Sequence, residues 1–245
     1  MTDAGRDSSP CDMQARDVPD LLTGLATTRA IRRYRDEPIP DHDLAAILWH
    51  ATRAPSGSNR QPFRFLVLRD GERARQAKAL LGTAFRAGWA AKREADGYTT
   101  GSGTDPDSPK ARAAATMQHY VDHIEQVPVI VLVCLVRYRP PSPSEGASVY
   151  PACQNLLLAA RALGYGGALT GWHRTVEPQL RTLLQIPDDA ALSACITLGR
   201  PVGSHGPVRR RPAREVVFDE TWGSEAAWID EPLGARHTSW RTPSR

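Results

Sequence analysis

Cysteine pairs, long apolar runs and lysine are scarce in this 245-residue chain, and each scarcity argues against a class of protein. The four cysteines are spread out without a C-x-x-C pair, which argues against a zinc ribbon or a redox dithiol. The longest apolar run, residues 127–136, is half of the roughly 20 residues that a membrane helix needs. The first fifteen residues lack the apolar segment of a secretory signal. We therefore expect a cytoplasmic protein without a membrane partner.

Lysine supplies only three of the 31 basic residues, so arginine carries most of the positive charge. The net charge of +4 favours anionic ligands. Codon bias also produces an arginine excess of this kind, so the excess alone does not indicate nucleic-acid binding. Aromatic residues make up only 7% of the chain and no known nucleic-acid-binding module is visible. We expect no nucleic-acid partner.

Three common catalytic signatures are also absent. The chain has no G-x-G-x-x-G, no G-x-x-x-x-G-K-[ST] and no G-x-S-x-G, so a Rossmann site, a P-loop and a hydrolase elbow lack support. His119 and His123 have the spacing of zinc ligands on a helix, but Tyr120 stands where a metalloprotease would carry glutamate. We predict no metal site.

The apolar pattern indicates a single α+β domain with three layers. A chain with 41% apolar and 24% charged residues has ordinary globular composition, and its length allows one sizeable core. Apolar periodicity and turn residues predict helices and strands in alternation, and we expect a mixed central sheet flanked by helices. The predicted helices cover 18–26, 42–52, 72–95, 111–125, 147–163 and 178–185. The predicted strands cover 63–68, 128–137, 166–172, 192–198 and 215–218.

Two terminal tails are expected on either side of this domain. Residues 1–16 are predicted to be a loose tail, 17–218 the domain, and 219–245 a second tail. The region from Pro201 to the C-terminus carries three tryptophans. Apolar side chains of this size predict that the tail packs on the body or on a second subunit.

Two arginine clusters, far apart in the sequence, have the chemistry to hold an anion. They are Arg29, Arg32, Arg33 and Arg35 after the first predicted helix, and Arg209, Arg210 and Arg211 near the C-terminus. A guanidinium can clasp a phosphate with two parallel hydrogen bonds. If the clusters converge, they form an anion pocket; the alternative is two solvated basic surfaces.

Two loops carry groups suited to a flat heterocycle. Residues 54–62, Ala-Pro-Ser-Gly-Ser-Asn-Arg-Gln-Pro, place hydroxyls and amides where they can bond a ring edge of alternating N–H and C=O groups. Residues 164–171 contain four glycines, which let the main chain approach a planar ligand closely. The alternatives are a plain turn for the first loop, and a helix cap at Gly164 followed by a tight turn for the second.

Taken in order, these segments resemble the nitroreductase family of FMN-dependent oxidoreductases. Residues 28–34, Thr-Arg-Ala-Ile-Arg-Arg-Tyr, followed by Pro-Ile-Pro, resemble the family's R-R-S-x-R-x-[FY]…P-[VI] start. Residues 54–65 resemble its A-P-S-x-x-N-x-Q-P-[WF]-x-F segment, and 154–166 its Q-N-L-x-L-A-A…G-L-G helix end. Residues 198–201, Leu-Gly-Arg-Pro, with a later Arg-Arg-Pro, resemble the closing segment. Four ordered matches are more specific than any single one.

The resemblance implies an α+β fold that forms an intertwined homodimer with FMN at its interface. Carried over by position, the first segment and the late arginines would contact the FMN phosphate. The 54–62 loop of the partner subunit would contact the pyrimidine edge of the flavin, and residues 169–171 would lie near flavin N5. The cofactor-binding residues so expected are Arg29, Ala30, Ile31, Arg32, Arg33, Pro55, Ser56, Ser58, Asn59, Leu169, Thr170, Gly171, Arg209, Arg210 and Arg211.

The chain departs from the family pattern in two places. Thr28 and Ala30 replace the usual arginine and serine, so one phosphate contact is lost or is supplied by Arg33. Residues 84–126, where members differ most and build the lid over the flavin, have no assignable motif. Phe85, Trp89 and Tyr98 are candidate lid aromatics that would stack on substrate. The i, i+4 spacing of the first two is equally typical of a helix core.

The resemblance also implies a reaction. NAD(P)H would reduce the flavin at N5, leave, and be replaced by a flat electron-poor acceptor such as a nitroaromatic or a quinone, which gives ping-pong kinetics. No side chain is expected to act as a catalytic acid or base. The alternatives are a flavin enzyme of the same fold that uses oxygen or a halogenated substrate, and a non-catalytic flavin-binding protein.

Overall fold

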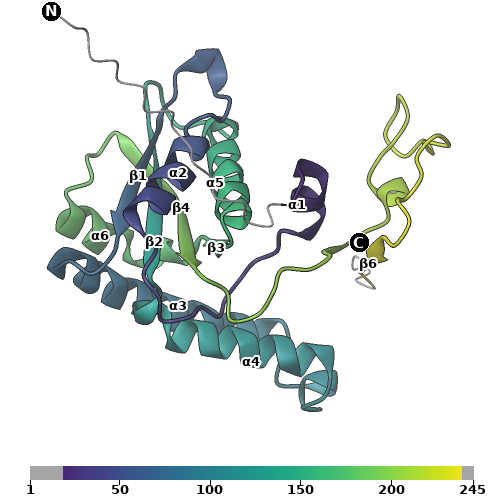
Figure 1. The fold of residues 1–245 in the computed structure, drawn as a ribbon, viewed down its shortest axis with the longest axis horizontal. Coiled ribbons are helices and arrows are strands. Elements are labelled where there is room, and N and C mark those ends of the chain that lie inside the picture. Colours follow the sequence, from purple (N-terminus) through teal and green to yellow (C-terminus); the bar gives the residue numbers. More distant parts are fainter. Residues whose placement is uncertain (1–18, 239–245) are drawn as a thin grey trace, which may run out of the picture.

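A four-stranded sheet forms the central layer of the computed structural model, which describes residues 19–238 (Figure 1). The strands are β1 (Phe63–Leu68), β2 (Val129–Val136), β3 (Gly166–Thr170) and β4 (Ala190–Gly199), in the spatial order β1-β2-β4-β3. Every neighbouring pair in this sheet is antiparallel. The predicted mixed sheet is therefore wrong for the part of the chain that the structure describes, because apolar alternation locates a strand without fixing its direction.

Helices cover both faces of the sheet, which confirms the expected three-layer α+β architecture (Figure 1). Helices α2 (Asp41–Ala51) and α5 (Tyr150–Ala162) pack on one face. Helices α3 (Glu72–Ala95), α4 (Pro109–Asp122) and α6 (Glu177–Leu184) belong to the core on the other. None of the described helices combines the length and the apolar character that a membrane span requires.

Strand β2 contributes side chains to both hydrophobic cores, as its nearly continuous apolar sequence predicts. Val129, Val131 and Val133 face the α2–α5 core, and Ile130 and Leu132 face the α3–α4–α6 core. Side chains of a strand alternate between faces, so a central strand buried on both sides is apolar at every position.

Strand β4 stays apolar on both faces although its alternation changes phase. Val133 pairs with Ala194 and the next residue, Cys134, pairs with Leu192, so Ser193 is the extra residue of a β-bulge. A bulge adds one residue to one strand and thereby inverts which positions face each side. Accordingly Leu192 faces the α3 side, and after the bulge Cys195 does.

Proline explains one boundary that the periodicity misplaced. Helix α5 begins at Tyr150, three residues after the predicted start, and residues 145–148 form a 3₁₀ turn instead. Pro151 lacks an amide hydrogen and is tolerated only in the first helical turn, where it lies here. At the other end Gly164 has φ = +82°, and the N–H of Tyr165 donates to Ala160 O at 2.8 Å, so the predicted glycine cap is confirmed.

Outside these layers lie helix α1 (Leu21–Thr27) and a C-terminal arm that we define as residues 205–238 (Figure 1). The arm contains two short strands, β5 (Arg209–Arg210) and β6 (Arg236–His237), paired in parallel. The predicted strand at 215–218 is wrong, because residues 213–215 form a 3₁₀ turn and only Phe218 makes an isolated bridge, with Glu225. The predicted tail 1–16, Cys11 and Trp240 lie outside the described residues.

Candidate cofactor site

The arginine-rich connector between α1 and α2 runs along the edge of the sheet at β3. Ile31 N–H donates to Gly167 O at 2.9 Å, and Arg35 N–H donates to Arg200 O at 2.8 Å. Val202 N–H returns a bond to Arg33 O at 3.1 Å. These backbone bonds fix the positions of residues 29–33 relative to β3 and to the segment that follows β4.

Glycines at the sheet edge let this connector approach closely. A Cβ on Gly166 would lie 2.4 Å from Ile31 Cγ1, and one on Gly199 would lie 2.8 Å from Tyr34 Cδ1. Real Cβ atoms essentially never come that near, so a side chain at either position would force its neighbour to move. The sequence predicts that the glycine run lets the main chain approach a ligand. At Gly166 and Gly167 this prediction is wrong, because the space that a side chain would occupy is filled by the protein's own atoms. Gly171 is more open, with its nearest such atom 3.8 Å away.

A cavity of about 930 Å³ opens beside the connector. Two of the predicted binding segments meet in its wall, since it is lined by Arg29, Ala30, Ile31, Arg32, Arg33, Leu169 and Thr170. Helices α3 and α4 form the remaining wall with side chains that include Trp89, Lys92, Tyr98, Arg112, Thr116, Met117 and Tyr120. Leu169 is exposed at the edge of the sheet.

The charged side chains that line the cavity are all positive. Five cationic side chains line the cavity, Arg29, Arg32, Arg33, Lys92 and Arg112, and no aspartate or glutamate does. Arg29 also donates from Nη2 to Ser204 O at 2.8 Å, which holds its guanidinium at the cavity edge. A cleft lined by one sign of charge concentrates ligands of the opposite sign. The cavity is therefore suited to an anionic ligand.

A buried hydroxyl network supports the connector from behind. Tyr34 Oη donates to Ile31 O at 2.5 Å and lies 2.8 Å from Thr197 Oγ1, which in turn lies 2.8 Å from Tyr120 Oη. Burial raises the pKa of both Tyr34 and Tyr120, so both hydroxyls keep their protons at neutral pH. Sequence reasoning missed Thr197 because it lies in an apolar strand and nothing local marks its partners.

The 54–62 loop has a defined backbone conformation, but it lies at the other edge of the sheet from the cavity. Ser58, Asn59 and Gln61 have φ of +53°, +50° and +49°, a conformation that costs each non-glycine residue about 1 kcal/mol or more. Ser56 Oγ accepts from Gln61 N–H at 2.9 Å and holds the turn. The loop precedes β1, an edge strand on the opposite side of the sheet from β3. Three strand spacings, roughly 14 Å, separate those edges.

The late arginines come near the connector without entering the cavity. Val208 N–H donates to Ala26 O at 3.2 Å, so the C-terminal arm passes the end of α1 just before the connector begins. Arg209 and Arg210 form β5, are exposed, and do not line the cavity; neither does Arg211. The structure thus brings the backbones of the two arginine clusters close together, and it does not bring their side chains into one pocket.

The three candidate lid aromatics separate into two groups. Phe85 is fully buried, packs on Tyr120 and Trp172 with ring centroids 5.9 and 5.4 Å apart, and is absent from the cavity wall. Its proposed stacking role is therefore replaced by a core role. Trp89 and Tyr98 do line the cavity, with centroids 5.2 Å apart.

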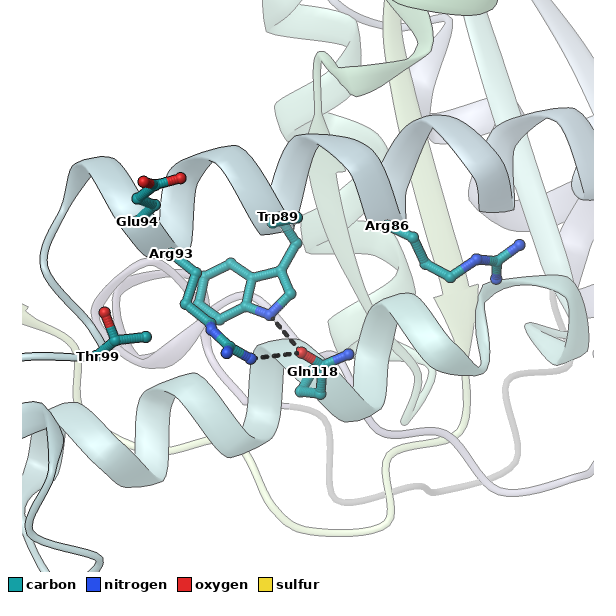
Figure 2. A pocket seen from close by; sticks show the side chains of 7 residues that line it. Arg86, Trp89, Arg93, Glu94, Thr99 and Gln118 are labelled. Atoms are coloured by element: carbon teal, nitrogen blue, oxygen red, sulfur yellow. Dashed lines mark hydrogen bonds between the residues drawn. The ribbon is translucent and has the colours of Figure 1, made fainter.

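Trp89 is held in place from the neighbouring helix. Its Nε1 donates to Gln118 Oε1 at 2.9 Å across the α3–α4 contact (Figure 2). Arg93 Nη1 donates to the same oxygen at 3.4 Å. A smaller cavity of about 440 Å³ lies on this side of the indole, so Trp89 contributes to both cavity walls.

Comparison with solved structures defines the class to which this fold belongs. A protein from Desulfovibrio desulfuricans, described as a nitroreductase in complex with FMN, is 27% identical, with a TM-score of 0.59. The alignment covers 83% of this chain and 98% of that one. The fold is therefore that of a nitroreductase.

Sequence comparison identifies the family. The model of the Nitroreductase family matches residues 25–200. An NADH dehydrogenase of Thermus thermophilus is 30% identical over 219 residues, 82% of this chain and 96% of that protein. A 5,6-dimethylbenzimidazole synthase of Rhodospirillum rubrum is 28% identical over 204 residues, 79% and 87% of the two chains. The chain belongs to the nitroreductase family, which confirms the resemblance, and it is an oxidoreductase by class.

Proposed function

We propose that this protein is an FMN-dependent oxidoreductase that passes hydride from NAD(P)H to an electron-poor acceptor such as a nitroaromatic or a quinone, with ping-pong kinetics. The observation that carries the proposal is the meeting of residues 29–33 and 168–170 in the wall of one cationic cavity. The residues present fit FMN, because the guanidinium groups suit its phosphate and the cavity is open along an edge strand.

Each part of the cavity has a separate task in this proposal. Arg29 and Arg32 bind the phosphate, and the bonds of Ile31 to Gly167 and Tyr34 keep those two side chains in position. Gly167 O accepts from the connector at the open edge of β3, and backbone groups alternate between the two sides of a strand, so the N–H of Leu169 faces the same open edge and can donate toward the ring. Bound FMN supplies two-electron chemistry at N5, and N–H donors there stabilise the reduced ring. No side chain needs to act as an acid or a base.

We further propose that the working unit is a homodimer. Pro55, Ser56, Ser58 and Asn59 lie across the sheet from β3, so a second copy is needed to bring them to the ring. Large apolar side chains that a single chain leaves exposed support this arrangement, including Leu21 and Leu22 of α1 at 72% and 75% and Trp222 of the arm at 93%. Patches of this kind mark interaction surfaces.

A reduction experiment tests the proposed activity. The purified protein is expected to be yellow, to be bleached anaerobically by NADH or NADPH, and to recover its colour with nitrofurazone. Bound flavin that neither nicotinamide reduces would overturn the hydride-transfer part.

The relative named a 5,6-dimethylbenzimidazole synthase is not named as a nicotinamide-dependent reductase, so it favours a second candidate with another acceptor. This candidate is a flavin enzyme of the same fold that uses oxygen or a halogenated substrate. Oxygen consumption by the reduced protein, without turnover of any nitro or quinone compound, would favour this candidate. Halide release from a halogenated aromatic would instead indicate dehalogenation.

A further inference from the structure

The cavity holds more positive charge than one flavin phosphate neutralises. Five cationic side chains line it without a carboxylate, and a phosphate monoester carries about −1.5 to −2 at neutral pH. Asp96, outside the lining, pairs with Lys92 at 2.5 Å and neutralises one further cation. A surplus of about two positive charges remains, and it is available to a second anion.

The five positively charged side chains lie on two walls of the cavity. Arg29, Arg32 and Arg33 come from the connector, whereas Lys92 comes from α3 and Arg112 from α4. Arg112 donates to the carbonyl of Asp107, and no described carboxylate pairs with it. A guanidinium has five N–H donors in a planar fork, so Arg112 retains donors for a ligand.

The same wall presents flat apolar surface beside those cations. The half-buried side chains of Tyr98 and Met117 line it, and Trp89, which is only 2% exposed, packs edge-on against the Tyr98 ring and supports it. Aromatic faces suit a planar ring, and the guanidinium suits an oxyanion attached to that ring. The wall therefore combines the two features that recognise a flat ligand with an acidic substituent.

We propose that the α3–α4 wall binds an anionic oxygen group, carboxylate or phosphate, on the molecule that exchanges electrons with the cofactor, with Arg112 as the main contact and Lys92 as the second. The inference rests on the proposed function and deepens it by naming the substrate class. The anionic group belongs either to an aromatic acceptor or to the phosphate that distinguishes NADPH from NADH.

Binding to the FMN-loaded protein tests the inference without turnover. Calorimetric titration with benzoate and benzamide compares two ligands of nearly equal shape that differ in charge. Wild type is expected to bind benzoate more tightly, and Arg112→Gln to weaken benzoate roughly tenfold while benzamide stays unchanged. Lys92→Gln should weaken benzoate less, because Asp96 already pairs with Lys92.

A matched control removes the same charge elsewhere. Arg73 is exposed on α3 and lines none of the cavities described, so Arg73→Gln should bind both ligands as wild type does. Added salt should weaken benzoate and not benzamide. Unchanged benzamide binding and flavin content in Arg112→Gln also show that this variant is folded.

Two turnover comparisons separate the possible sources of the anion. Loss of the preference for 4-nitrobenzoate over 4-nitrobenzamide in Arg112→Gln assigns the group to the acceptor. Loss of a preference for NADPH over NADH assigns it to the nicotinamide. Equal benzoate binding in wild type and Arg112→Gln, with both preferences unchanged, overturns the inference and leaves the proposed function standing. Flavin that no nicotinamide reduces overturns the proposed function, while the benzoate titration still tests the wall.

Discussion

Replacing Gly166 by alanine tests whether close packing of Ile31 on β3 positions the phosphate-binding arginines. The new Cβ would lie 2.4 Å from Ile31 Cγ1 and 2.9 Å from Ile31 Cβ, against the 3.5–4.0 Å at which carbon atoms attract one another. The connector must therefore move by about 1 Å, and forced contacts of this kind cost about 1–3 kcal/mol. For a chain of this size, each kcal/mol lowers Tm by roughly 2–4 °C.

Cofactor binding should weaken together with stability. Ile31 lies between Ala30 and Arg32, so moving its backbone also moves the guanidinium groups that we assign to the phosphate. We expect Gly166→Ala to lower Tm by roughly 2–12 °C. We also expect it to raise the Kd for FMN, followed by quenching of flavin fluorescence, roughly tenfold.

Two further variants control this experiment. Gly71→Ala makes the same chemical change at the N-cap of α3, where a Cβ meets nothing within 4 Å. It should cost only about 0.5–1 kcal/mol, because alanine is a poorer N-cap than glycine, and it should leave FMN affinity unchanged. Ile31→Ala removes Cγ1, the nearer of the two clashing atoms, so the double variant should be less destabilised than the sum of the single ones, with a coupling of about 0.5–3 kcal/mol. If Gly166→Ala matches Gly71→Ala in both Tm and FMN affinity, the positioning argument is refuted.

Three other predictions use different parts of the molecule. Arg32→Gln should weaken FMN binding by roughly ten- to a hundredfold because a charged hydrogen bond is lost. Arg35→Gln changes a residue outside the cavity wall and should leave FMN binding unchanged. Equal effects of the two variants would contradict the assignment of Arg32 to the phosphate. Burial lowers the pKa of His173 below its ordinary 6.5, so the unfolded state gains the proton first and the free energy of unfolding should fall as pH drops below about 6.5. Urea unfolding at pH 7 and pH 5 should show a smaller fall in His173→Gln, and an identical fall would contradict this reading. Burial raises the pKa of Cys134 to about 11 and of Cys153 to about 12, and that of Cys195 rises as well. In a Cys11→Ser variant these three thiols should therefore react with a disulfide reagent at pH 8 only after unfolding, and prompt reaction of the native protein would contradict their burial.

The sequence was most informative where the physics is local. Helix α3 has the bounds that its turn residues and periodicity predict, and β2 is buried on both faces as its apolar run indicates. Local reasoning failed at residues 215–218, where strand-forming side chains have no partner strand, since pairing depends on distant residues. It also failed at α5, where Pro151 outweighs the apolar pattern.

The site was predictable only in part for the same reason. The motif around Arg29 and Arg32 located one wall of the cavity, and Leu169 and Thr170 located another. Lys92 and Arg112 were not predicted, because they lie in a region without a motif and face the cavity only once α3 and α4 pack together. Thr197 was missed as well, because its role depends on tyrosines that lie 163 and 77 residues away in the sequence.

The cofactor assignment can be tested by sedimentation of the protein after incubation with FMN, recorded at a visible wavelength that only flavin absorbs. The account predicts that the flavin sediments with the protein as one species with the mass of two chains, carrying one FMN for each chain. Flavin that stays in the slow fraction while the protein sediments as a colourless monomer would contradict it.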